Sequence, residues 1–264
     1  IFVFIFFFII KMKSVENFYN KEGWSLTKDN SKDAELFEDL RYYSNEYVSK
    51  CRLKVLKYIP KKGGENILDF ASGPIQYKEY LKYSKNFNTR HCVDFSKHAI
   101  KQAKEKLGNK GKYYCEDILN LQFSEDYFDT IICIHTLYHI NKFKQKKVVE
   151  KLLRISKKGS PIIIIYSNPI PFISRLKKFF FLKKKKKQLI YFYCYENKWW
   201  KQFEKMATVK IVPWRSFSAQ HQKILFPNNI IGKFLLKILF FLEERYKNFF
   251  TKNFQYPMII LKKK

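Results

Sequence analysis

Hydrophobic positions along this chain change their period from one segment to the next, and each period predicts an element. From residue 33 to residue 58, apolar residues return every three or four positions, which is the period of one helix face. From residue 66 to residue 168, short apolar runs alternate with amphipathic, Lys-rich segments. Strands that alternate with helices in this way predict a mostly parallel, doubly wound α/β sheet.

The strands of that sheet are bounded by glycine, proline and polar clusters. Five are predicted, at residues 66–70, 90–95, 112–117, 128–137 and 160–168. Helices are predicted at residues 74–84, 96–107 and 143–157. The run FDTIICIHTL (128–137) is almost continuously apolar, which is typical of a central strand buried on both faces. Downstream, the sequence predicts a helix at 195–206, a strand at 214–221, an amphipathic helix at 228–247 and a final strand at 256–263.

These elements suggest four segments along the 264 residues: an apolar extension (1–11), an N-terminal helical cap (12–62), a core (63–168) and a C-terminal region that completes the sheet and contacts substrate (169–264). The apolar stretch at the start, IFVFIFFFII, is shorter than the about 20 residues that span a bilayer. It has no signal-peptide pattern. We interpret residues 1–11 as sequence translated from upstream of Met12, with a membrane-anchoring stub as the alternative.

The charge of the chain is extreme, with 52 Lys and Arg against 23 Asp and Glu and a net charge of +29. Such a charge suits a nucleic acid or an anionic lipid surface. Nearly all the basic residues are Lys, however, and Phe, Ile, Asn and Tyr are also abundant, so A/T-rich codon usage is the favoured cause. The scarcity of Arg argues against a nucleic-acid reader. The five cysteines form no C-x-x-C pair, which indicates reduced thiols in a cytoplasmic protein.

Three acidic residues fall at the carboxyl ends of predicted strands: Asp69, Asp94 and Asp117. Ligands of open parallel sheets bind beyond those strand ends. The turn after the first strand, in ILDFASGP, carries a single glycine, Gly73, and the carboxylates would repel a phosphate. A nucleoside with an amino-acid tail fits this set better. Each acid alone has an alternative reading as a helix cap or a turn residue.

In these motifs the sequence resembles the class I S-adenosylmethionine (SAM)-dependent methyltransferases, most closely the UbiE/quinone-methyltransferase-like (methyltransferase type 11) small-molecule group. The matching stretches are ILDFASGP, VDFS, CEDILNL, FDTIICIHTLYHI and LLRISKKGSPIIIIYSNP. The resemblance covers about residues 65–168, and the flanking segments suggest an uncharacterised bacterial subgroup. It implies a Rossmann-like seven-stranded sheet with an N-terminal helical segment and a C-terminal insertion, SAM as cofactor, and methyl transfer (EC 2.1.1.-).

The resemblance also implies a cofactor site. Its residues are Asp69, Ala71, Gly73, Asp94, Phe95, Asp117, Ile118, His135 and Thr136. Asp94 would accept the ribose hydroxyls, Phe95 would pack on adenine, and Asp117 with the Ile118 amide would read the adenine edge. His135 and Thr136 would line the methionine side.

The glycine turn departs from the family pattern at two positions. Ala71 and Ile75 stand where glycines are common. Ala71 fits the turn if its φ is negative and is strained if its φ is positive. Pro74 and Ile75 are expected in the first turn of the following helix, where a side chain and a missing amide are tolerated.

Catalytic groups are expected after the fourth strand, at His135, Tyr138 and His139. They would orient or deprotonate the acceptor; the alternative is that the histidines only line the pocket. No metal site is expected, because HTLYH lacks an accompanying carboxylate. An aromatic cluster is expected in the core, with an aromatic wall around the substrate as the alternative; its members are Tyr191, Tyr193, Tyr195, Trp199 and Trp200.

The acceptor is expected to be a small molecule, a glycan or a lipid-linked compound, and the sequence fixes neither its identity nor the oligomeric state. A second hypothesis is a membrane-surface protein built on the same fold, because residues 175–189 and 228–247 mix Lys with bulky apolar side chains. A third is an RNA methyltransferase, which the charge suits but which lacks an RNA-binding module or an NPPY-type tetrapeptide. The expected location is cytoplasmic, with peripheral contact to an anionic membrane as the variant.

Overall fold

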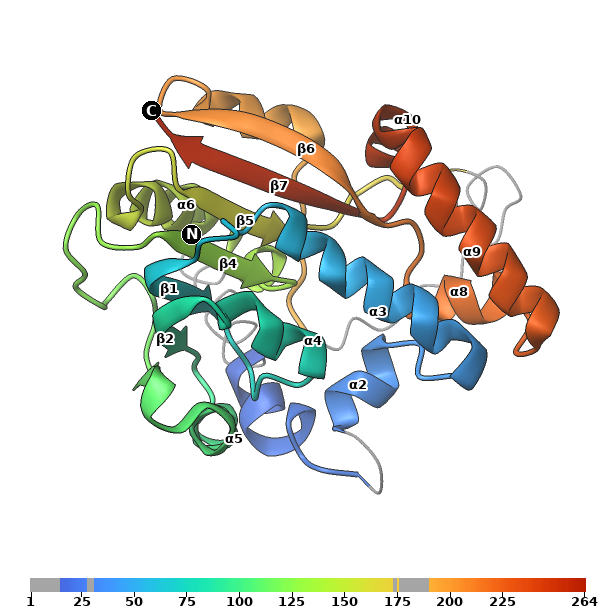
Figure 1. The fold of residues 1–264 in the computed structure, drawn as a ribbon, viewed down its shortest axis with the longest axis horizontal. Coiled ribbons are helices and arrows are strands. Elements are labelled where there is room, and N and C mark those ends of the chain that lie inside the picture. Colours follow the sequence, from blue (N-terminus) through green and yellow to red (C-terminus); the bar gives the residue numbers. More distant parts are fainter. Residues whose placement is uncertain (1–14, 28–30, 173–174, 176–189) are drawn as a thin grey trace, which may run out of the picture.

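The computed structural model describes residues 15–27, 31–172, 175 and 190–264. Seven strands form one sheet in the order β3-β2-β1-β4-β5-β7-β6 (Figure 1). Their bounds are β1 Gly64–Phe70, β2 Phe87–Val93, β3 Gly111–Tyr114, β4 Thr130–Ile134, β5 Pro161–Ile165, β6 Ala207–Arg215 and β7 Tyr256–Lys263. β1 to β5 are parallel, whereas β7 runs antiparallel to both β5 and β6. The predicted α/β fold with a seven-stranded, doubly wound sheet is confirmed.

The centre of the sheet is β4, which pairs with β1 on one side and with β5 on the other. Successive residues of β4 enter opposite layers of core, as the two-residue period of a strand requires. Ile131 packs in the cluster that includes α6, and Ile132 packs in the cluster that includes α3 and α9. The prediction of a central strand buried on both faces is therefore confirmed.

Helices cover both faces of the sheet (Figure 1). The α-helices are α2 Lys32–Phe37, α3 Asn45–Leu53, α4 Lys78–Leu81, α5 Lys97–Leu107, α6 Lys142–Ile155, α8 Ala219–Leu225, α9 Ile230–Arg245 and α10 Lys247–Asn253. A π-helical turn spans Tyr19–Gly23, and 3₁₀ turns span Tyr42–Ser44, Lys54–Lys57, Lys82–Ser84, Gly108–Lys110, Leu137–His139 and Asn197–Phe203. α5, α6, α9 and β7 confirm the helices predicted at 96–107, 143–157 and 228–247 and the strand predicted at 256–263.

The single helix predicted from residue 33 to residue 58 is wrong, because the chain breaks between α2 and α3. Glu38 ends α2 in an extended conformation, with φ −118° and ψ 153°. Its buried carboxylate accepts hydrogen bonds from Arg52 and Arg215. These ion pairs replace the helical continuation that the apolar period indicated.

The start of the helix predicted at 74–84 is also wrong. α4 begins only at Lys78 and has four residues, and Pro74 and Ile75 lie in the preceding turn. The Lys106 ammonium donates hydrogen bonds to the carbonyl oxygens of Pro74 and Ile75, at 2.7 and 3.0 Å. Carbonyls held in this way are not available to a helical ladder.

The C-terminal region differs in two places. The helix predicted at 195–206 is the 3₁₀ segment Asn197–Phe203. The strand predicted at 214–221 is wrong: β6 ends at Arg215, and the Ser218 hydroxyl then caps α8 by accepting from the His221 amide. Within the aromatic cluster, Trp200 is fully buried, whereas Tyr195 and Trp199 stack half-buried at a centroid distance of 4.6 Å.

Two expectations concern residues outside the described part of the chain, namely the apolar extension at 1–11 and most of the Lys-rich segment 175–189. Among the described residues, no helix combines the length and the apolar composition needed to cross a bilayer.

Candidate functional site

In the turn after β1, every second residue has a positive φ. Ala71, Gly73 and Ile75 all have positive φ, at 56°, 54° and 49°. A side chain in this left-handed region costs about 1–2 kcal/mol, so Ala71 adopts the strained alternative rather than the relaxed one. The Ser72 amide ties the turn to β2 by donating to the Val93 carbonyl over 3.1 Å. Strain that the surroundings hold in place is frequent at ligand sites.

Asp94 follows β2 and connects this turn to the start of α5. Its Oδ2 accepts from the Gly73 amide and its Oδ1 from the Ser96 amide, both over 2.9 Å. Burial raises the pKa of Asp94 to about 6, although the two amides oppose the rise. A carboxylate offers about four lone-pair sites, so two remain for further donors.

Asp69, the acid at the end of β1, has a different environment. It is buried and paired with Arg90 of β2, whose Nε donates to Asp69 Oδ2 over 3.1 Å and whose Nη2 contacts the same oxygen. The guanidinium also donates to the Tyr80 carbonyl over 2.6 Å. Asp69 therefore binds β1 to β2 and α4, and its contact with a cofactor stays a prediction.

An open hollow of about 760 Å³ lies beyond the carboxyl ends of β2 and β3. Phe95 and Asp117 line it from the sheet side, and Glu16 and Asn20 line it from the N-terminal segment. Asp117 Oδ1 accepts from the Leu119 amide over 2.9 Å, while Ile118 packs in the core below. Two of the predicted adenine residues, Phe95 and Asp117, therefore border one cavity, and their contact with adenine stays a prediction.

The N-terminal segment around Tyr19 and Trp24 packs on the turn that holds Gly73. The sequence did not predict this contact. A Cβ on Gly73 would lie 3.0 Å from the Trp24 ring, and Trp24 stacks on Tyr19 at 5.0 Å between centroids. The Tyr19 carbonyl accepts from the Ser96 hydroxyl over 3.5 Å, and the Tyr19 hydroxyl donates to Asp33 over 3.3 Å. No periodic pattern in the sequence marked this contact.

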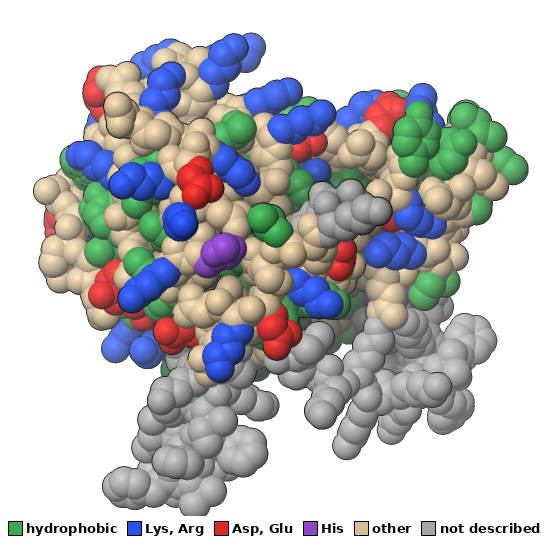
Figure 2. All heavy atoms as spheres, turned by 90° about the horizontal axis from the view of Figure 1, so that it is seen from below, with side chains coloured by type: hydrophobic (Ala, Val, Ile, Leu, Met, Phe, Trp, Pro, Cys, Tyr) green, Lys and Arg blue, Asp and Glu red, His purple; other side chains and the backbone are tan. Residues whose placement is uncertain are grey.

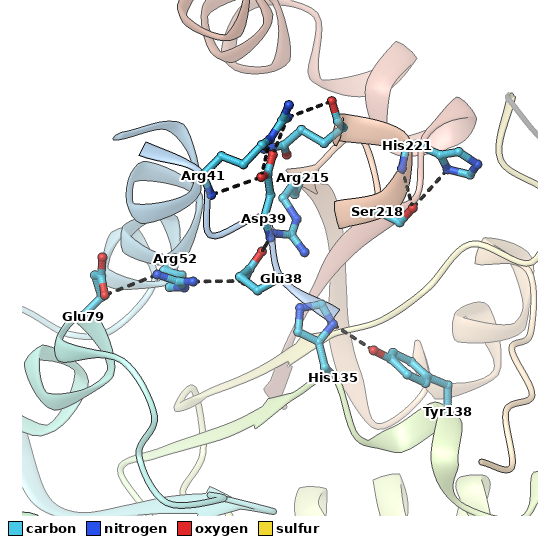
Figure 3. A network of polar contacts seen from close by, with 11 residues as sticks. Glu38, Asp39, Arg41, Arg52, Glu79, His135, Tyr138, Arg215, Ser218 and His221 are labelled. Atoms are coloured by element: carbon cyan, nitrogen blue, oxygen red, sulfur yellow. Dashed lines mark hydrogen bonds and ion pairs between the residues drawn. The ribbon is translucent and has the colours of Figure 1, made fainter. Parts of the chain in front are cut away.

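His135 follows β4 with a φ of 57°. Its Nδ1 lies 2.9 Å from the Tyr138 hydroxyl (Figure 3), and its ring packs edge-on against Trp214 and Tyr256 at 4.7 and 5.0 Å. Its Nε2 is buried, and no described residue forms a hydrogen bond with it. Burial first, and then the Arg215 charge, lowers the pKa of His135 to about 3, so the imidazole is neutral at physiological pH.

A buried ion network lies beside His135. Glu38 stands between Arg52 and Arg215 (Figure 3), and Arg52 Nη1 also approaches Glu79 at 3.6 Å. The network joins the N-terminal region, α3, α4 and β6. The sequence analysis assigned no role to Glu38 or to Arg215.

His139, expected on the acceptor side, and Thr136, expected on the methionine side, differ in their surroundings. His139 Nδ1 lies 2.7 Å from the Tyr191 carbonyl, and burial lowers the pKa of His139 to about 4. The Thr136 hydroxyl donates back to the Ile134 carbonyl over 3.1 Å. Within the described ranges, no three His, Cys, Asp or Glu side chains are grouped so as to hold a metal ion.

Comparisons with known proteins agree with this fold. Residues 68–164 match the family described as "Methyltransferase domain". A SAM-dependent methyltransferase from Archaeoglobus fulgidus superposes with a TM-score of 0.56 at 18% identity, covering 83% of this chain and 95% of that one. Magnesium protoporphyrin IX methyltransferase from Synechocystis PCC 6803, solved with S-adenosylhomocysteine, superposes with a TM-score of 0.59 at 12% identity, covering 96% and 99%.

A curated relative is an uncharacterized protein of Methanocaldococcus jannaschii, 28% identical over 154 residues. The alignment spans 58% of this chain and 61% of the relative, so it leaves more than a third of each outside. Residues 68–164 thus resemble a methyltransferase domain, and the sheet has the fold of the solved class I methyltransferases.

Proposed function

We propose that this protein transfers a methyl group from S-adenosylmethionine to a small-molecule acceptor, and that it falls in the UbiE-like small-molecule group. The observation that carries the proposal is the double contact of Asp94 with Gly73 and Ser96. It sets one carboxylate, with acceptor capacity left over, at the meeting point of the first two strand ends. Open α/β sheets bind ligands beyond the carboxyl ends of their strands.

The chemistry of the donor set fits the cofactor in two parts. Asp94 would accept the ribose hydroxyls through charge-assisted hydrogen bonds. Phe95 and Asp117 border a hollow of about 760 Å³, which is large enough for an adenine ring. Phe95 would stack on the ring, and Asp117 with the Ile118 amide would read its polar edge.

Bound S-adenosylmethionine supplies an electrophilic methyl group on a sulfonium. What this chain must add is alignment of the acceptor and exclusion of water. His135 and Tyr138 lie at the end of β4, within one hydrogen bond of each other. His135 is neutral, so one ring nitrogen accepts a hydrogen bond and orients an acceptor hydroxyl or amine. His139 Nδ1 already lies 2.7 Å from the Tyr191 carbonyl. In this proposal His139 therefore supports the acceptor side and does not contact the acceptor.

Buried charged side chains also lie beside His135, on the side where the acceptor is expected. The network of Glu38, Glu79, Arg52 and Arg215 is buried and its charges balance, which favours a compact acceptor entering beside it over a flipped base on a long polynucleotide. A glycan or a lipid-linked compound remains within this class of acceptor.

The test combines binding and turnover. Calorimetry on the dialysed protein should give micromolar-range affinity for S-adenosylmethionine, unaffected by a chelator. Labelled cofactor incubated with separated cell fractions (small molecules, lipids, glycans, RNA) should then label a compound outside the RNA fraction. Absence of heat at high ligand concentration would refute the cofactor assignment, and labelling of RNA alone would refute the acceptor class.

A further inference from the structure

One side of α9 is apolar and exposed. The residues on this side are Ile230, Ile231, Phe234, Leu235, Ile238 and Phe241. They are spaced by one, three or four residues, so they form a continuous arc along the helix. Phe234 is 61% exposed and Phe241 is 64% exposed, whereas Leu236, Leu239 and Glu243 are buried against the sheet. We call the exposed residues the α9 arc.

The apolar surface extends beyond α9. Ile224 at the end of α8 is 70% exposed, and Phe249 of α10 is 57% exposed. In the space-filling view, hydrophobic side chains gather at the end of the molecule that holds α8 and α9, with Lys and Arg side chains beside them (Figure 2). Large contiguous apolar surfaces of this kind mark a contact with a partner or a membrane.

The charge around the α9 arc is positive. From residue 219 to residue 253 there are six Lys or Arg and two Glu. One of those glutamates, Glu243, is buried and paired with Lys54 at 2.6 Å. The surface that a partner meets is therefore apolar in its middle and basic at its edge.

A small cavity of about 200 Å³ lies where α3 meets α9, next to the arc. Three lysines line it, and all three share one carboxylate: Glu46 lies 2.8 Å from Lys50, 3.4 Å from Lys233 and 3.9 Å from Lys237. Three ammonium groups on one carboxylate leave positive charge uncompensated. The cavity thus offers donors to an anionic group that approaches beside the apolar arc.

We propose that α8, α9 and α10 form a docking surface for an anionic lipid bilayer, with the α9 arc entering the interface and the lysine cavity meeting lipid headgroups. Apolar side chains bordered by Lys are the composition of interfacial helices, and basic residues near an anionic surface strengthen the binding. A second copy of this chain fits less well, because two such surfaces would bring the same positive charges together.

The docking surface is tied to the acceptor side of the site. Arg41 donates to the Gln222 and Phe226 carbonyls at the end of α8, at 3.2 and 2.9 Å, and pairs with Asp39 at 2.8 Å. Asp39 adjoins Glu38, the centre of the buried ion network (Figure 3). Docking would thus bring the acceptor side near lipid, although the proposal itself goes beyond methyl transfer and does not require it.

The experiment is co-sedimentation of the purified protein with vesicles. Vesicles of phosphatidylcholine containing phosphatidylglycerol should pellet the protein, and vesicles of phosphatidylcholine alone should pellet at least about tenfold less. The double variant F234E/F241E should lose this binding. The matched control is Phe143→Glu on α6, a 71%-exposed phenylalanine outside the arc, which should bind as the unmodified protein does. Replacing Lys233 and Lys237 by Gln should reduce the dependence on phosphatidylglycerol.

Circular dichroism and a cofactor titration without vesicles would establish that each variant is folded. Equal pelleting of F234E/F241E and Phe143→Glu, or pelleting that ignores phosphatidylglycerol, would overturn the proposal. So would a dimer in solution that F234E/F241E dissociates while the vesicles pellet nothing. Neither vesicle experiment uses the cofactor. Absence of vesicle binding would therefore leave the proposed methyl transfer intact, and absence of methyl transfer would leave the docking proposal intact.

Discussion

The Gly73 amide donates to Asp94 Oδ2 over 2.9 Å, and this bond joins the turn after β1 to the end of β2. The same carboxylate receives the Ser96 amide on its other oxygen. Asp94 therefore holds the local backbone and, under the proposed function, the ribose. Loss of the first role should lower stability, and loss of the second should lower cofactor affinity, so a variant at Asp94 can test both.

Replacing Asp94 by Ala should weaken both stability and binding. Two amides lose their acceptor, and a buried polar group left unpaired costs about 1–3 kcal/mol. Two charge-assisted bonds to the ribose would also be lost, so the affinity for S-adenosylmethionine should fall by about ten- to a hundredfold. Thermal melts and calorimetry on the same variant measure the two effects.

The control for that variant is Asp129→Ala. Asp129 also receives a strand amide, from Asn66 at 2.9 Å, and pairs with Lys157 at 2.6 Å, away from the candidate cofactor site. It should lower the melting temperature and leave the affinity unchanged. If Asp94→Ala behaved like Asp129→Ala, Asp94 would be a backbone tether only.

Cofactor affinity should depend on pH through Asp94. Its pKa is raised to about 6 by burial, and the ribose hydroxyls bind the ionised form, so binding lowers that pKa. Affinity should therefore be full above about pH 6 and fall as pH drops below it, by up to about tenfold per pH unit. Calorimetry between pH 5 and 8 measures the profile. Asp94→Asn cannot ionise, so any slope that persists in this variant belongs to another group.

Gly73→Ala should disturb the segment around Trp24 more than its backbone strain alone explains. The new Cβ would lie 3.0 Å from the Trp24 ring, whereas a Cβ on Gly159 would meet nothing within 4 Å at a φ of 71°. Gly159→Ala should cost about 1–2 kcal/mol, the cost of a side chain at positive φ. Gly73→Ala should cost more and shift the Trp fluorescence. Equal losses and unchanged fluorescence would mean that Trp24 does not rest on Gly73 in solution.

The sheet was predictable because its signals are local. The continuous apolar run of β4 follows from burial on both faces, and the three- and four-residue spacing of α9 follows from its one buried face. Asp94 was found in the same way, since it follows directly on β2, whereas Asp117 lies beyond the end of β3 at Tyr114.

The errors arose where distant partners decide the local conformation. The apolar period continues through Glu38, but its ion-pair partners Arg52 and Arg215 are 14 and 177 residues away in sequence. Ile75 was expected in a helix, but Lys106, 31 residues away, holds its carbonyl in the turn. The contact of Trp24 with Gly73 has no periodic signal at all. Pairing between remote residues is the part that a single sequence leaves undetermined.

Glu38→Gln should be among the most destabilising single changes of a polar residue in the described chain. Burial raises the pKa of Glu38, but Arg215 and then Arg52 outweigh it and hold the pKa below 4.5. Glutamine keeps the shape and removes the charge, so the buried Arg215 guanidinium loses the Glu38 carboxylate and Arg52 keeps only its 3.6 Å contact with Glu79. Breaking a buried ion pair in this way costs about 3–5 kcal/mol. Because the folded-state pKa is lowered, this stabilisation is present above about pH 4.5 and is lost as pH falls through the folded pKa. The difference in unfolding free energy between the two proteins should therefore be large at pH 7 and shrink in acid, as urea titrations would measure.

Glu150→Gln is the control, since its exposed pair with Lys146 at 3.7 Å should contribute less than about 1 kcal/mol. A loss as small as that of Glu150→Gln, or one independent of pH, would show that the network does not carry the break between α2 and α3.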